Sequence, residues 1–114
     1  MIAVYIAGPY RASTQTVIDR HVRRASKVGA ELCALGYAAL VPHSMTAHWD
    51  DHYGVSIEAI MAADFELLGR CDAVLVLPGW EASEGTKAEI AHAEACGIPV
   101  YYSREELLHG RPAE

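Results

Sequence analysis

Residues 72–89 read Asp72-Ala-Val-Leu-Val-Leu-Pro-Gly-Trp-Glu-Ala-Ser-Glu-Gly-Thr-Lys-Ala-Glu89, and this stretch decides the fold. Its apolar run over 73–77 predicts a buried strand, the proline and glycine that follow predict a tight loop, and the residues from Thr86 onward predict a helix. A strand, a loop and a helix in this order form the unit of a parallel α/β sheet. The order places Glu89 above the carboxyl end of the sheet, where open α/β folds bind their ligands.

The chain of 114 residues has the size of one domain, and we expect a single domain over residues 1–114. Apolar residues make up 52% of it, which is enough for a folded core. The start of the chain does not have the order of a secretion signal, and no run approaches the roughly 18 apolar residues of a membrane span. The cysteines, Cys33, Cys71 and Cys96, form no C-x-x-C pair, so we expect free thiols and a cytoplasmic location.

The net charge of −6 argues against a nucleic-acid partner, which requires a basic surface. The charge is uneven, because residues 1–35 hold five Lys or Arg against two Asp or Glu, whereas residues 36–114 hold four against thirteen. Arg11 or Lys87 could therefore still bind a small anion. The other basic residues of the first part are expected to form a solvated helix face; they are Arg20, Arg23, Arg24 and Lys27.

Strands and helices alternate along the chain. Strands are predicted over residues 2–7, 37–41, 73–77 and 98–102, and helices over 17–35, 57–68, 86–96 and 104–108. Ser13 or Thr14 can cap the first helix and Ser56 the second, and Gly36 follows the first helix where a terminating glycine belongs. Residues 43–54 show no clear period and are predicted to form a long loop, which in compact domains is often functional.

This βαβαβαβα order predicts an α/β fold with a doubly wound parallel sheet, Rossmann-like or flavodoxin-like, of four to five strands. In the flavodoxin-like strand order 2-1-3-4, the direction of winding changes between the first and third strands. The loops 8–13 and 78–85 are then expected to face each other across a cleft.

Asp64 falls within the apolar stripe of the helix predicted over 57–68. The stripe follows a three- and four-residue spacing and consists of Ile57, Ile60, Met61, Leu67 and Leu68. Burial of an unpaired carboxylate lowers stability, so Asp64 must have an ion-pair partner, a hydrogen-bond partner or a function in a binding or catalytic site. It either lies at the edge of the stripe or bonds to a loop amide, or it has a pKa tuned by desolvation and a like-charged neighbour.

Glu89 has two interpretations. Thr86-x-x-Glu89 matches a capping box, in which the glutamate bonds back to the cap amide. Alternatively, Glu89 is a catalytic carboxylate, because Pro78, Gly79 and Gly85 leave backbone room for a ligand and helix-start amides attract anions. Enzymes that cleave glycosidic bonds typically use two carboxylates that lie in one cleft.

Polar residues of the middle segment raise the question of a metal; they are His43, His48 and His52 with Asp50 and Asp51. Their spacing matches no standard zinc pattern and no cysteine joins them, so we expect no metal there, but a polar active-site loop or plain surface.

Tyr5 lies on the opposite face of the first strand from Val4 and Ile6 by simple alternation. A buried tyrosine needs a partner for its hydroxyl, and the cleft carboxylates are candidates, although a core-filling role fits nearly as well.

These residues resemble the nucleoside 2-deoxyribosyltransferase superfamily, which includes nucleoside-monophosphate N-glycosidases and small uncharacterised relatives. The resemblance spans most of residues 1–102, with the middle segment unmatched. The matching pieces are Val4-Tyr5-Ile6-Ala7-Gly8-Pro9-Tyr10-Arg11, Asp64, Asp72-Ala-Val-Leu-Val and Gly85-Thr-Lys-Ala-Glu89-Ile-Ala-His-Ala.

The resemblance implies that Glu89 is the nucleophile on the sugar C1′, that Asp64 is the acid/base partner and that Tyr5 positions Glu89. Arg11 stands where nucleoside-level transferases tend to carry an aromatic, and an arginine there would suit a 5′-phosphate. The residues expected to bind sugar or phosphate are Gly8, Pro9, Tyr10, Arg11, His43, Ser83, Gly85 and Thr86.

The expected function is cleavage of the N-glycosidic bond, or (deoxy)ribosyl transfer, on a nucleoside or nucleoside 5′-monophosphate through a covalent glycosyl-enzyme intermediate, with no cofactor and no membrane partner. A homo-oligomer, dimer or tetramer, is expected because so small an α/β layer needs further burial. Two alternatives remain. Leu77-Pro-Gly followed by Gly-Thr-x-x-Glu also resembles phosphoribohydrolases of the lysine-decarboxylase-like group, although those chains are usually longer and lack the placement of Asp64. The other alternative is a non-catalytic nucleotide-binding or sensor module.

Overall fold

A parallel sheet of four strands forms the centre of the computed structural model, which describes residues 1–110. The strands lie in the order β2-β1-β3-β4, which confirms the predicted order and the α/β fold class. Their bounds are β1 (Ala3–Ala7), β2 (Ala38–Leu40), β3 (Ala73–Val76) and β4 (Val100–Tyr101). In the described part of the chain, no helix has the length and apolar character needed to cross a bilayer.

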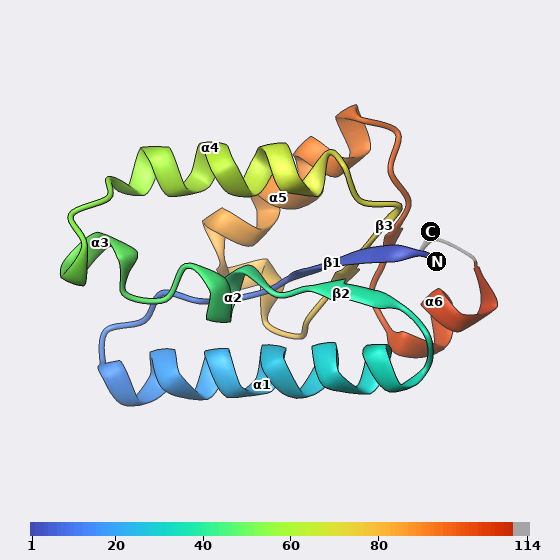
Figure 1. Cartoon of the computed structure of the whole chain (residues 1–114), viewed down its shortest axis with the longest axis horizontal. Helices are drawn as coiled ribbons and strands as arrows, with labels where there is room; N and C mark the ends of the chain where they lie inside the picture. The colour runs from blue at the N-terminus through green and yellow to red at the C-terminus, as the bar shows by residue number, and fades with distance from the viewer. Residues whose placement is uncertain (111–114) are drawn as a thin grey trace.

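Helices cover both faces of the sheet (Figure 1). On one face lie α1 (Gln15–Ala34) and the short α6 (Arg104–His109), and on the other lie α4 (Ile57–Leu68) and α5 (Glu84–Ala95). Two buried clusters correspond to these two layers. The sheet is therefore doubly wound, as predicted.

The central strands β1 and β3 are apolar on both faces because both faces are covered. Their register pairs Tyr5 with Val74 and Ala7 with Val76. Val4 and Ile6 pack in the α1 layer, whereas Tyr5 packs in the α5 layer. The face predicted for Tyr5 is therefore confirmed, and its side chain is fully buried.

Local signals set the ends of α1. The side chain of Thr14 accepts a hydrogen bond from the amide of Val17, so Thr14 is the cap. Gly36 follows the helix with φ 93°, a conformation that glycine adopts without strain. The buried face of the helix consists of Ala25, Gly29 and Leu32.

The loop predicted over residues 43–54 is wrong in part, because two single-turn helices lie there, α2 (Pro42–Met45) and α3 (Trp49–His52). A helix of four residues cannot repeat a 3.6-residue apolar period, so the sequence pattern does not reveal it. Figure 1 shows α3 at one end of the molecule, where the chain turns back into α4.

Gly29 provides a test of the packing of α1 on the sheet. A Cβ at this position would lie 2.6 Å from Cγ2 of Val41, well inside van der Waals contact. Because valine is stiff at χ1, we expect Gly29→Ala to lower the free energy of unfolding by about 1–3 kcal/mol, although alanine has the higher helix propensity. Urea denaturation followed by circular dichroism measures the change.

Gly85→Ala is the matched control, because no atom of the described residues 1–110 lies within 4 Å of a Cβ there and the residue is also helical. It should be neutral or stabilise by up to about 1 kcal/mol. A Gly29→Ala variant as stable as the Gly85→Ala variant would contradict the described packing of α1.

Candidate active site

A cleft with a cavity of about 870 Å³ lies at the carboxyl ends of β1 and β3. The volume falls within the roughly 300–1,000 Å³ typical of small-molecule sites. The loops after these two strands both line it, together with residues of α1, α2 and α4 and the start of α5. Because the winding of the sheet reverses between β1 and β3, the two loops leave in opposite directions and a crevice opens between them.

The innermost polar contact of the site joins Tyr5 of β1 to Glu89 of α5. The hydroxyl of Tyr5 donates a hydrogen bond to Oε2 of Glu89. Burial, together with the nearby charges of Glu89 and Asp64, raises the pKa of Tyr5, so the phenol stays protonated and remains a donor. The two interpretations of Tyr5 are therefore compatible: its hydroxyl bonds to a cleft carboxylate, and its ring fills a position in the core.

Burial raises the pKa of Glu89 from its ordinary 4.5 to about 7. The hydrogen bond from Tyr5 lowers this pKa and the charge of Asp64 raises it, and both effects are smaller than that of burial. Glu89 is therefore a desolvated carboxyl group that is partly ionised near neutral pH.

The capping-box interpretation of Glu89 is wrong. Helix α5 begins at Glu84 and is capped by Ser83, whose Oγ accepts hydrogen bonds from the amide of Thr86 at 3.2 Å and from its hydroxyl at 2.8 Å. Thr86 therefore lies within the first turn, and Glu89 lies in the second turn, where the amides already bond to helix carbonyls. Its carboxylate is thus available to Tyr5 and the cleft.

Asp64 of α4 lines the same cleft. Burial raises its pKa from 3.8 to about 6, and among residues 1–110 its buried Oδ1 has no hydrogen-bond partner. The charge of Asp64 also raises the pKa of Glu89. Desolvation thus accounts for the raised pKa of Asp64, as one part of its interpretation predicted, whereas the like-charged neighbour affects the pKa of Glu89 and not that of Asp64.

Every residue expected to bind sugar or phosphate lies in the lining of the cleft, and Tyr5 is fully buried behind Glu89. The loop after β1 passes close to β3, because a Cβ on Gly8 would lie 2.8 Å from Cβ of Leu77. His43 is buried, and its Nε2 lies 2.9 Å from the carbonyl oxygen of Gly8, so His43 also supports this loop. The roles of these residues in binding remain predictions.

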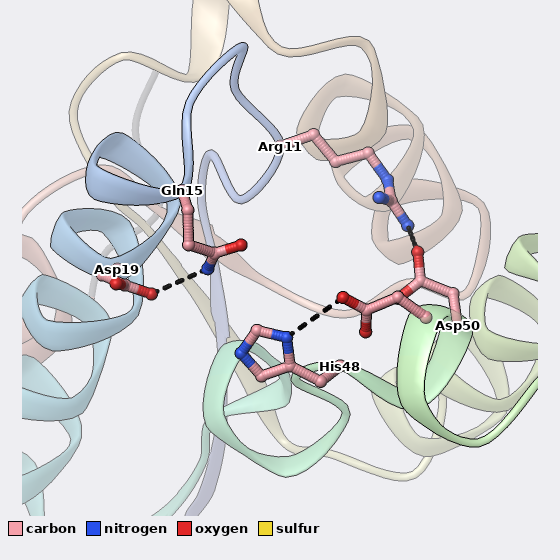
Figure 2. A network of polar contacts seen from close by, with 6 residues as sticks. Arg11, Gln15, Asp19, His48 and Asp50 are labelled. Atoms are coloured by element: carbon pink, nitrogen blue, oxygen red, sulfur yellow. Dashed lines mark hydrogen bonds and ion pairs between the residues drawn. The ribbon is translucent and has the colours of Figure 1, made fainter.

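Arg11 lies in the cleft lining and is turned toward Asp50 of α3 (Figure 2). Its Nη2 lies 3.1 Å from Oδ2 of Asp50, and the side chains are 54% and 27% exposed, so solvent screens the pair. The guanidinium holds the pKa of Asp50 below its ordinary value. A phosphate bound to Arg11 would either replace the Asp50 carboxylate or use other N–H groups of the guanidinium, and phosphate binding by Arg11 stays a prediction.

The prediction that Arg24 belongs to a solvated helix face is wrong, whereas Arg20, Arg23 and Lys27 are exposed as predicted. Arg24 lines the cleft, and its Nη2 donates to the carbonyl oxygen of Pro78 at 3.0 Å. His21, which also lines the cleft, lies three residues earlier on α1. This helical spacing was the signal that could have placed Arg24 at the edge of the buried stripe.

The polar residues of the middle segment divide into two groups. His43 and Asp50 line the cleft, whereas His48, Asp51 and His52 are not part of its lining. The ligand atoms of these last three lie within 4.8 Å of one another, an arrangement that could hold a metal ion. The expected absence of a metal therefore stays a prediction.

A family model described as "Domain of unknown function (DUF7768)" matches residues 2–103. No curated protein has a sequence that matches the chain. The fold is similar to that of a 2-deoxyribosyltransferase from Bacillus psychrosaccharolyticus, with a TM-score of 0.58 and 22% identity over 86% of this chain and 69% of that chain. It is also similar to that of a CMP N-glycosidase from Clostridium botulinum, with a TM-score of 0.57 and 18% identity over 96% of this chain and 82% of that chain. The resemblance noted in the sequence is thus confirmed in the fold.

Glu89→Gln tests the burial of the Glu89 charge through stability. Folding raises the pKa of Glu89 from 4.5 to about 7, so the folded state favours the protonated carboxyl group. The contribution of this group to the free energy of unfolding is therefore fully present below pH 4.5 and is lost as the pH rises through 7. Glutamine keeps an acceptor for Tyr5 and removes the buried charge. We therefore expect the variant to be more stable than wild type by about 2–3 kcal/mol at pH 8, with a smaller gain at pH 5, in urea denaturation.

Glu94→Gln is the control, because Glu94 is an exposed residue of the same helix. Its stability should follow that of wild type at both pH values. A destabilised Glu89→Gln variant at pH 8 would show that the carboxylate is not under the burial penalty described.

Proposed function

The chain belongs to the family described as "Domain of unknown function (DUF7768)", and we propose that it is an enzyme that cleaves the N-glycosidic bond of a nucleoside or nucleoside 5′-monophosphate, by hydrolysis or by (deoxy)ribosyl transfer. The observation that carries the proposal is the convergence of Glu89 and Asp64 on one cleft of nucleotide size, with Tyr5 bonded to Glu89 from behind. The two similar structures, a 2-deoxyribosyltransferase and a CMP N-glycosidase, support it.

In the first step, Glu89 attacks the sugar C1′. Tyr5 holds Oε2, so Oε1 is the oxygen available for attack. The bond from Oε1 to C1′ forms as the bond from C1′ to the base nitrogen breaks, through an oxocarbenium-like transition state. The electron pair of the broken bond goes to the base, and Asp64, with a pKa of about 6, supplies the proton that neutralises it.

In the second step, water or a second base attacks C1′ and releases the Glu89 carboxylate. Asp64, now ionised, takes the proton of the attacking group, which restores the starting protonation state. Two displacements at C1′ give net retention of configuration. Desolvation assists the first displacement, since a poorly hydrated carboxylate is a stronger nucleophile.

The expected homo-oligomer and the cytoplasmic location stay proposals. Ile57 and Met61 line the cleft, and they are 43% and 39% exposed. A nucleobase or a second copy of the chain that covered these side chains would remove apolar surface from water.

Base release is the direct test of the proposed function. A panel of purine and pyrimidine nucleosides and their 5′-monophosphates is incubated with the protein, and free base is measured by chromatography. We expect release by wild type and a loss of at least about 10³-fold in Glu89→Gln, because the nucleophile is removed. Glu94→Gln should keep wild-type activity.

The same assay separates the alternatives. Ligand-induced thermal stabilisation without release would favour the binding or sensor module. Release from monophosphates alone, unaffected by Asp64→Asn, would favour the phosphoribohydrolase. Wild-type activity in the Glu89→Gln variant would rule out the covalent mechanism.

The pH dependence of kcat/KM tests the roles of the two carboxyl groups. In the reactive form of the enzyme, Glu89 is ionised and Asp64 is protonated. Because the pKa of Glu89 is about 7 and that of Asp64 is about 6, the fraction of enzyme in this form is largest between pH 6 and 7. Tyr5→Phe removes the donor that lowers the pKa of Glu89. We therefore expect a bell-shaped profile whose maximum, in Tyr5→Phe, moves to higher pH and falls by about tenfold or more. A variant with lower activity but an unmoved maximum would show that Tyr5 has only a packing role.

A further inference from the structure

Buried polar atoms without a hydrogen-bond partner gather around the cleft. Among residues 1–110 they are Arg24 Nε, His43 Nδ1 and Asp64 Oδ1, and all three residues line the same cavity. Native proteins pair nearly all buried polar atoms, since an unpaired one reduces stability. Three such atoms around one cavity indicate that a ligand or an ordered water in the cleft supplies their partners. The proposed reaction uses Asp64, gives Arg24 no role and does not say which group of the substrate His43 contacts.

His43 presents a hydrogen-bond acceptor to the cleft. The residue is only 6% exposed, and its Nε2 lies 2.9 Å from the carbonyl oxygen of Gly8, so Nε2 must carry the hydrogen and donate. Burial lowers the pKa of the imidazole, which is therefore neutral at pH 7. A neutral ring with its hydrogen on Nε2 has a lone pair on Nδ1, so the missing partner of Nδ1 is a donor.

Arg24 presents a hydrogen-bond donor. Its Nη2 donates to the carbonyl oxygen of Pro78 at 3.0 Å, which ties the guanidinium of α1 to the loop after β3. Its buried Nε–H can only donate, so its missing partner is an acceptor. Arg24 of α1 and His43 of α2 line the same cavity, and these two helices lie against each other.

We propose that Arg24 and His43 form a recognition subsite for an uncharged group of the substrate that accepts one hydrogen bond and donates another. A ribose hydroxyl and the edge of a nucleobase both have this chemistry. A fully ionised phosphate does not, because none of its oxygens carries a hydrogen for the lone pair of Nδ1. This inference rests on the proposed function, since it concerns how the same cleft recognises its substrate.

Two substitutions remove one bond each and leave the supporting contact. His43→Gln keeps a terminal N–H in reach of the Gly8 carbonyl and removes the acceptor at Nδ1. Arg24→Lys keeps the positive charge and removes the Nε donor. Arg23→Lys, at the neighbouring exposed position of α1, is the matched control. All three are made in the Glu89→Gln background so that ligand is not consumed.

Isothermal titration measures binding of nucleosides, of analogues that lack one hydroxyl or one base nitrogen, and of the 5′-monophosphates. We expect His43→Gln and Arg24→Lys each to weaken nucleoside binding by about tenfold or more, and Arg23→Lys to leave it unchanged. Each analogue is compared in the Glu89→Gln parent and in the variant that also carries His43→Gln. If the group missing from the analogue is the one that His43 binds, the analogue binds the parent more weakly than the full nucleoside does, but the variant binds both equally. Loss with a deoxynucleoside identifies a hydroxyl, and loss with a deaza analogue identifies the base edge.

The inference is overturned if both variants bind every nucleoside as the Arg23→Lys control does, even where wild type releases base and the proposed function stands. It is also overturned if the effect of Arg24→Lys is confined to monophosphates, since the subsite would then hold phosphate. A readout without ligand separates the two proposals further. Nitrogen-15 NMR of His43 should show a neutral ring protonated at Nε2 at pH 7, and a proton on Nδ1 would end the inference whatever the enzyme does.

Discussion

Parallel pairing of β1 with β3 is the constraint on which the rest of the structure depends. The register that sets Ala7 beside Val76 brings both strands to an end at the same level, so the two following loops begin side by side. A one-residue slip would move Tyr5 to the α1 face and away from Glu89. Because both strands are buried on both faces, the cost of such a slip is high, and the geometry of the cleft follows from the packing of the sheet.

The site holds groups that a protein selected for stability alone would not retain. Glu89 is ionised only against a burial penalty, and within residues 1–110 a buried oxygen of Asp64 has no hydrogen-bond partner. The core that compensates for them lies directly beneath, in the apolar strands and in the α5 face formed by Ile90 and Ala93. Such a division between a cleft with desolvated carboxyl groups and a well-packed sheet is typical of sites that bind or transform a ligand.

Most of the fold could be predicted from the sequence, because the apolar runs of the strands and the long period of α1 are strong local signals. Asp64 could be recognised for the same reason, since a charge stands out within an apolar stripe. The single-turn helices α2 and α3 could not, because one turn carries no period. Arg24 was missed because a long side chain at the edge of a stripe reaches either solvent or a cleft, and only the position of the Pro78 carbonyl decides which.

The choice between a cap and a catalytic role for Glu89 shows where local pattern reasoning ends. Ser83 and Thr86 are both good capping residues, and α5 would start about one turn later if Thr86 were the cap. Had Thr86 been the cap, Glu89 would have bonded to its amide and Tyr5 would have been left without a partner. Capping by Ser83 instead leaves Glu89 available to the hydroxyl of Tyr5. The buried phenol, 84 residues away in the sequence, therefore has its hydrogen-bond partner only when α5 starts after Ser83. The start of the helix is thus linked to a long-range contact, and a sequence window around residues 83–89 does not contain that contact.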